Sequence, residues 1–173
     1  MKHVSIVALA VALIAAGCSK SSSPTNPTPT KPTFTADLRT SNEVPPIANA
    51  ESSGTGSATI TFDVTRDASN NVTAGTATFV ANVSGFPAGT ALNIMHIHEA
   101  PAGTNGNIVV QSGLTAGEVT LVNGAASITK SNIMLDPAVA TRILNNPAGF
   151  YFNIHSTLNP GGVIRGQLVK IAG

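Results

Sequence analysis

Strict alternation of apolar and polar residues between positions 57 and 64 constrains the fold more than any other feature of this sequence. Every even position there is apolar and every odd position is polar. A period of two is that of a β-strand with one buried face. Residues 72–83 carry a similar pattern, with apolar side chains at every odd position from 77 onward. Because residues 67–71 between them are rich in turn formers, the two segments predict a long β-hairpin.

Further strands are predicted on both sides of this hairpin, at residues 34–38, 92–99, 108–111, 118–122, 125–129, 149–156 and 163–171. Asn123-Gly124 lies between two of these strands and is typical of a two-residue hairpin turn. Asp136 and Pro137 predict the start of one clear helix, because Asp caps a helix and Pro fits its first turn. With about eight short strands and one short helix, the sequence predicts an all-β domain, a Greek-key-like β-sandwich.

Residues 1–17 have the features of an export signal, and we leave them out of the predicted fold. Lys2 precedes an apolar run from Val4 to Ala16, which is too short to span a bilayer as a mature helix. The run ends just before Cys18, and this arrangement resembles the signal peptide of a bacterial lipoprotein. The resemblance implies cleavage before Cys18 and acylation of the chain there, with palmitate as a usual acyl group. An ordinary secretory signal followed by an unrelated cysteine is the alternative.

Cys18 is the only cysteine, so no disulfide can form within the chain and the core alone must hold the domain together. Residues 18–33 are rich in Ser, Thr and Pro, which predicts a disordered linker. The folded domain is then expected over residues 34–173. We expect a protein anchored by lipid in the cell envelope, at the outer membrane or the cell surface. Its expected partners are the membrane itself and an envelope protein or matrix component.

Charge and motifs exclude several classes of function. The formal net charge is +1 and the basic residues are scattered, so nucleic acid is not an expected partner. The sequence also contains no Gly-x-Ser-x-Gly nucleophile motif, phosphate-binding loop or paired-cysteine motif. A hydrolase is therefore poorly supported, and the sequence predicts no catalytic residue.

Three histidines form the one candidate site for ligand chemistry. In the strand predicted at 92–99, His96 and His98 share one face, while Met95 and Ile97 share the other. His155, in a later predicted strand, is the only other histidine outside the signal peptide. Three neutral imidazoles suit copper or zinc with an open fourth position. Hydrogen bonding between strands is the favoured alternative, and a binding pocket without metal is the third.

Arg165 is a charged residue inside the last predicted strand, where a guanidinium needs carboxylate or carbonyl partners. Glu43 and Glu99 are the candidate carboxylates. We expect Arg165 and Glu43 to form a structural clamp, with binding of an acidic ligand as the alternative. Glu99 follows His98 directly and so falls on the opposite strand face, which makes it a poor metal ligand.

Several motifs resemble those of the CHRD domain, which occurs in chordin and in many exported bacterial proteins. They are Glu43-Val44-Pro45-Pro46, Gly54-Thr55-Gly56, His96-Ile97-His98 and the segment from Tyr151 to Leu168. Val163 departs from the pattern, because the family usually has Glu there. The resemblance implies an all-β sandwich and no known reaction.

A weaker analogy links the His-x-His pair and the late histidine to copper/zinc superoxide dismutase, although the bridging histidine, zinc cluster and disulfide of that enzyme are missing here. We therefore predict a lipid-anchored envelope module with a structural or binding role and no catalysis. The alternative is a copper- or zinc-binding protein, with a dismutase-like redox site.

Overall fold

The computed structural model describes residues 30–173. The predicted signal peptide, Cys18 and most of the predicted linker lie outside the described residues. The described chain forms ten strands, one α-helix and two short 3-10 helices. The strands are β1 Thr33–Arg39, β2 Thr55–Arg66, β3 Val72–Ser84, β4 Thr90–Glu99, β5 Asn107–Gln111, β6 Val119–Leu121, β7 Ala126–Met134, β8 Phe150–Ser156, β9 Ile164–Gln167 and β10 Val169–Ala172. The helices are η1 Thr40–Asn42, α1 Pro137–Asn145 and η2 Pro147–Gly149.

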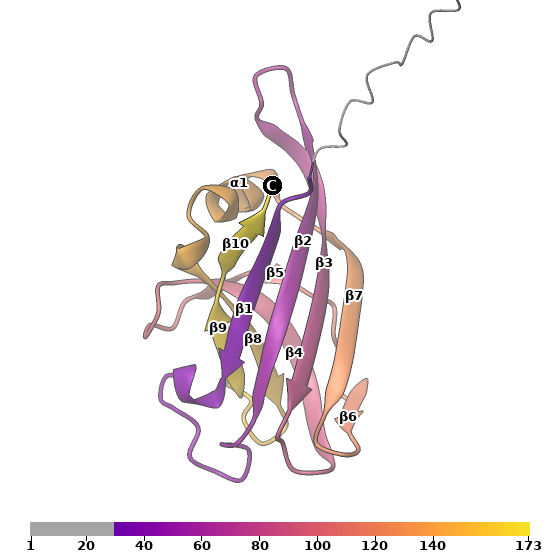
Figure 1. Cartoon of the computed structure of the whole chain (residues 1–173), viewed down its shortest axis with the longest axis vertical. Helices are drawn as coiled ribbons and strands as arrows, with labels where there is room; N and C mark the ends of the chain where they lie inside the picture. Colours follow the sequence, from indigo (N-terminus) through magenta and orange to yellow (C-terminus); the bar gives the residue numbers. More distant parts are fainter. Residues whose placement is uncertain (1–29) are drawn as a thin grey trace, which may run out of the picture.

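All strand pairs are antiparallel and belong to one hydrogen-bonded sheet with the order β5-β4-β8-β9-β1-β2-β3-β7. The sheet curls, so that β1, β2, β3 and β7 form one layer and β4, β5, β8 and β9 lie behind it (Figure 1). The predicted all-β, two-layered class is confirmed. The predicted long hairpin is also confirmed, because β2 and β3 pair from Thr55 opposite Ser84 to Arg66 opposite Val72.

The apolar faces of the two layers meet in a single core. Phe34 and Phe62 pack with ring centres 5.1 Å apart, and Phe79 meets Phe152 edge to face at 5.6 Å. Phe79 lies in the first layer and Phe152 in the second, so this contact joins the layers. Aromatic contacts of this kind stabilise the fold by about 0.5–1.5 kcal/mol, in addition to the contribution of the apolar area that they bury.

The hairpin predicted at Asn123-Gly124 is wrong. A turn does form there, with Gly124 at φ +70° and its N–H donating to the Leu121 carbonyl at 3.2 Å. However, β6 pairs with β4, whereas β7 pairs with β3. The long edge of β3 offers β7 many more backbone partners than the three residues of β6 do. The turn therefore carries the chain from one layer to the other and brings the two ends of the sheet together.

The last predicted strand is also divided. Leu168 is buried between β9 and β10, and its N–H bonds to the Phe150 carbonyl at 2.9 Å. Before this point β9 pairs with both β8 and β1, and after it β10 pairs with the first residues of β1. The segment therefore joins the two layers.

Helix α1 begins where the sequence predicts. The Asp136 carboxylate accepts hydrogen bonds from the N–H groups of Ala138 and Val139 at 2.8 and 3.0 Å. Near its end, Arg142 forms a two-bond ion pair with Glu99 of β4. Within residues 30–173, none of the helices combines the length and apolar character needed to cross a bilayer.

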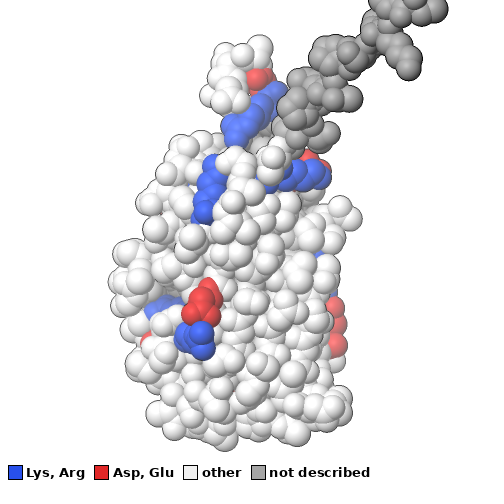
Figure 2. Space-filling model, in the orientation of Figure 1, with Lys and Arg blue, Asp and Glu red and all other residues white. Residues whose placement is uncertain are grey.

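Charged side chains are sparse on the face shown in Figure 2, and basic ones lie apart from each other or beside acidic ones. Two of the ion pairs in the described chain are Lys31–Asp63 at 2.6 Å and Arg39–Asp37 at 3.1 Å. Exposed pairs of this kind contribute about 0–1 kcal/mol, so the apolar core is the main source of stability.

Candidate metal centre

A β-bulge in β4 sets the direction of the site histidines. The register between β4 and β8 shifts between Leu92 and Ile94. Beyond the shift, Met95 and Ile97 enter the core, whereas His96 and His98 point away from it. On the neighbouring β8, Tyr151, Asn153 and His155 alternate with the core residues Phe152 and Ile154 and so share the face of the two histidines.

This outward face of β4, β8 and β9 is not open to solvent, and we call it the covered face. Loops after β1, β4 and β8 lie over it and contribute backbone carbonyls to its side chains. His96 is fully buried, and His98 and His155 are only 8% and 7% exposed. The domain therefore has a second interior, polar in character, on the side of the sheet opposite the apolar core.

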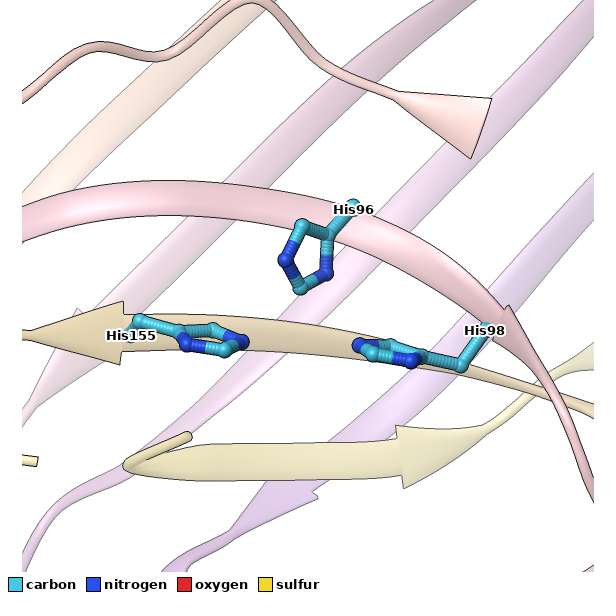
Figure 3. Close-up of side chains that lie close together, drawn as sticks. All are labelled: His96, His98 and His155. Atoms are coloured by element: carbon cyan, nitrogen blue, oxygen red, sulfur yellow. The ribbon is translucent and has the colours of Figure 1, made fainter. Parts of the chain in front are cut away.

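The three imidazoles meet within this polar interior. His98 and His155 lie end to end along β8, and the His96 ring enters the space between them from β4 (Figure 3). One ring nitrogen from each residue can be chosen so that all three lie within 4.8 Å of one another. The sequence assigned these residues to two strands far apart in the chain, and the fold brings them together.

Backbone hydrogen bonds fix the tautomers of two of the rings. Nδ1 of His98 lies 2.8 Å from the Gly106 carbonyl, and Nδ1 of His155 lies 2.7 Å from the Pro160 carbonyl. A carbonyl only accepts, so each Nδ1 carries the hydrogen and each neutral ring keeps its lone pair on Nε2. Neither Nε2 has a hydrogen-bond partner, and neither nitrogen of His96 has one.

Burial keeps all three rings in the neutral form that binds metals. Burial, followed by the proximity of His155 and His98, lowers the pKa of His96 to about 3. Burial is also the main cause that lowers the pKa values of His98 and His155 below their ordinary value. Four buried, unpartnered ring nitrogens in one small volume are costly, because each unsatisfied polar group costs about 1–3 kcal/mol.

Comparison with known protein families assigns the chain to one family. The family model of the CHRD domain matches residues 34–168, a span that contains all three histidines. The chain belongs to the CHRD domain family. No curated protein and no solved structure matches it.

A stack of three side chains supports His98 in the CHRD domain. The Tyr151 ring lies parallel to the His98 ring at 4.6 Å, and the Arg165 guanidinium lies 4.6 Å from the centre of the Tyr151 ring. Gly106 bonds to two members of this stack, because its carbonyl accepts from His98 and its N–H donates to the Tyr151 hydroxyl at 3.3 Å. Such outer contacts orient metal-binding histidines and tune their affinity.

Arg165 binds mainly carbonyl groups of the covering loops. Its Nε donates to the Asn42 carbonyl at 2.6 Å, and Nη1 donates to the Asn105 side chain at 2.8 Å and the Thr104 carbonyl at 3.3 Å. The Glu43 carboxylate is farther away, at 3.8 Å from Nε. Burial raises the pKa of Glu43 to about 7, although Arg165 and a hydrogen bond from Asn153 act in the opposite direction.

Several residues of the site were not predicted from the sequence. Tyr151 and Asn153 share the strand parity of His155, so a period of two was the signal that would have found them. Gly106 and Pro160 act through backbone carbonyls, and residue type gives no signal for such a role. Glu99 points away from the histidines and pairs with Arg142 instead.

Proposed function

We propose that this CHRD domain binds one copper or zinc ion through His96, His98 and His155. The observation that carries the proposal is the convergence of buried ring nitrogens that have no hydrogen-bond partner. Copper and zinc both accept neutral imidazole, and a three-histidine site leaves a further position open for water or a substrate. Bound there, the ion would supply a Lewis-acid or redox centre, which the side chains alone lack.

The geometry favours this proposal over a purely structural role for the histidines. A structural role requires the rings to hydrogen bond with neighbouring strands, yet His96 has no bond at either nitrogen. His98 and His155 each use one nitrogen to hold a turn, and their free nitrogens face the same gap. Hydrogen bonds to turns explain the two Nδ1 atoms but not the other four nitrogens.

Binding is better supported than catalysis. Among residues 30–173, this cluster is the only group of three or more metal-ligating side chains, so a second ion site like that of a copper/zinc dismutase is not formed there. We propose a binding or structural module of the envelope, with the metal ion as its ligand.

Adding metal to the metal-free protein should raise its melting temperature. A ligand at 100 times its dissociation constant stabilises the folded state by about 2.7 kcal/mol, which corresponds to roughly 8 °C for a domain of this size. We would measure copper and zinc content, then melting with each ion, on the full chain carrying Cys18→Ser and prepared without a histidine tag. His98→Ala should lower the affinity by more than about 100-fold, since losing a ligand costs more than losing an outer contact.

Asp63→Ala is a suitable control, because Asp63 is an exposed potential ligand on β2, far from the covered face. It should leave binding unchanged. A protein that binds neither ion and shows no change in melting temperature would contradict the proposal.

We further propose that the domain is anchored to the envelope by lipid on Cys18, with residues 19–33 as the spacer. Each buried CH₂ contributes about 0.8 kcal/mol, so two or more acyl chains hold a protein firmly on a membrane. In a Gram-negative host, Cys18→Ser should move the protein from the membrane fraction to the soluble fraction, while Ser22→Ala should not. Retention of Cys18→Ser in the membrane fraction would exclude this anchor.

A further inference from the structure

We propose that the three histidines form a T-shaped site that selects copper, including cuprous copper, over zinc. In this site His98 and His155 are the two opposed ligands, and His96 is the ligand at right angles to them. The inference rests on the proposed function and specifies both the ion and its geometry. It follows from how the three rings are placed relative to one another.

The distance between His98 and His155 matches a linear pair of ligands. Their ring centres are 6.4 Å apart and their planes differ by only 8°. An imidazole nitrogen lies ~1.1 Å from the ring centre and a metal–nitrogen bond is ~2.0 Å, so two opposed rings on one ion have centres ~6.2 Å apart. The same arithmetic gives ~5.4 Å for trigonal and ~5.1 Å for tetrahedral coordination. Of these three values, the observed distance lies nearest to the linear one.

His96 completes the T. Its ring centre lies 4.5 Å from that of His98 and 4.6 Å from that of His155, and its plane is nearly perpendicular to both. A ligand at right angles to a linear pair would place its ring centre ~4.4 Å from each of the other two. The three centres thus form a nearly right-angled triangle, with the ion expected midway between His98 and His155. In Figure 3 the two nitrogens of His96 lie on either side of the ring carbon that faces this position, so the His96 ring must turn to direct one of them at the ion.

The surrounding contacts resist a change to tetrahedral geometry. Tetrahedral coordination would require the centres of His98 and His155 to approach by more than ~1 Å. Each ring is tied through Nδ1 to a different turn, and His98 is also stacked on Tyr151. Closing the pair would strain those hydrogen bonds and the stack together, so the site is organised for opposed ligands before any ion arrives.

Copper and zinc differ in their tolerance of this arrangement. Zinc in proteins is almost always tetrahedral when four-coordinate, whereas cupric copper prefers tetragonal positions at right angles to each other. Cuprous copper accepts two or three ligands, including linear and T-shaped sets. A T-shaped set of imidazoles therefore fills three of the four positions of a square-planar cupric ion. For cuprous copper the same three imidazoles complete the coordination.

Preference for cupric copper over zinc is not a sufficient test, because nearly every nitrogen site shows it. The test is therefore competition with a cuprous chelator and, separately, with a zinc chelator, on the full chain carrying Cys18→Ser. We expect cuprous affinity to exceed zinc affinity by at least about 100-fold. X-ray absorption of the cuprous form should show three nitrogen ligands at ~2.0 Å.

Single substitutions test the T shape directly. Removing His96 leaves the linear pair, so His96→Leu should lower cuprous affinity by only about 10-fold, whereas His98→Ala and His155→Ala should each lower it by at least about 1,000-fold. Circular dichroism of each metal-free variant would establish that it is folded. Binding of copper and zinc with similar affinity, or equal losses in all three variants, would overturn the T-shaped site but leave metal binding intact. Absence of binding of any ion would instead overturn the proposed function.

Discussion

Replacing Arg165 with methionine is expected to lower the free energy of unfolding by about 3–5 kcal/mol, the loss typical of removing one partner from a buried charged network. Arg165 is only 3% exposed. Its guanidinium binds the loop after β1 through Asn42 and the loop after β4 through Thr104 and Asn105. Methionine fills a similar volume but donates no hydrogen bond, so these partly buried contacts to two loops would all be lost.

Arg142→Met is the matched control. Arg142 makes two hydrogen bonds to Glu99 at 3.0 and 2.9 Å, but this ion pair is exposed. Exposed pairs contribute about 0–1 kcal/mol, so the same chemical change should cost far less there. Urea unfolding followed by circular dichroism would compare the two variants. If they lose similar amounts of stability, Arg165 does not hold the covering loops.

Arg165→Lys tests whether the planar set of guanidinium donors matters, or only the positive charge. Arg165→Lys keeps the positive charge near Glu43 but cannot reach two loops with a planar set of donors. We expect it to recover only part of the stability lost in Arg165→Met. Full recovery would mean that charge, and not hydrogen-bond geometry, is what Arg165 contributes.

The sequence predicted the elements of this fold well because burial on one strand face leaves a clear period of two. The alternation at residues 57–64 gave β2, and the Asp136-Pro137 pair gave the start of α1. Pairing between distant elements was harder. Asn123-Gly124 predicted a turn, but turn chemistry does not say which edges the flanking strands choose, and β7 pairs with the longer β3.

In the candidate site too, local features were predictable from the sequence, whereas contacts between distant segments were not. Strand parity placed His96 and His98 on one face, because that depends only on the residue spacing. The sequence could not show that loops cover this face, since a polar strand face normally faces solvent. Nor could it show the partners that set the tautomers, which are the backbone carbonyls of Gly106 and Pro160.

Without metal, the domain should become less stable as the pH falls from 6.5 toward 4. The ordinary pKa of histidine is 6.5, and in the folded protein the pKa of His96 is about 3. Between these values the unfolded chain binds a proton that the folded protein excludes. The free energy of unfolding therefore falls by about 1.4 kcal/mol per pH unit for each such group, which gives about 3 kcal/mol at pH 4 for His96 alone. His98 and His155 act in the same direction, because their pKa values are also lowered, mainly by burial.

Glu43 acts in the opposite direction. Its pKa is raised from 4.5 to about 7 in the folded protein, mainly by burial, so between these values the folded state holds a proton that the unfolded chain has lost. As the pH falls through this range, Glu43 adds about 1.4 kcal/mol of stability per pH unit, which offsets one of the three histidines. Over pH 6.5–4.5 Glu43 therefore cancels the contribution of His96, and the net loss of stability comes from His98 and His155. Below about pH 4.5 His96 acts without this offset.

Two variants separate these opposed contributions. Urea unfolding at several pH values, with a chelator present, should give a steeper pH dependence for Glu43→Gln and a shallower one for His96→Leu. Each slope should differ from that of the unsubstituted protein by about 1.4 kcal/mol per pH unit. The reason is that each substitution removes one group that binds a proton in only one of the two states, folded or unfolded. The signs are opposite, so a general loss of stability cannot mimic both results. Parallel pH profiles for all three proteins would mean that these buried groups exchange protons with solvent as freely in the folded state as in the unfolded chain, and the polar interior would then not be closed.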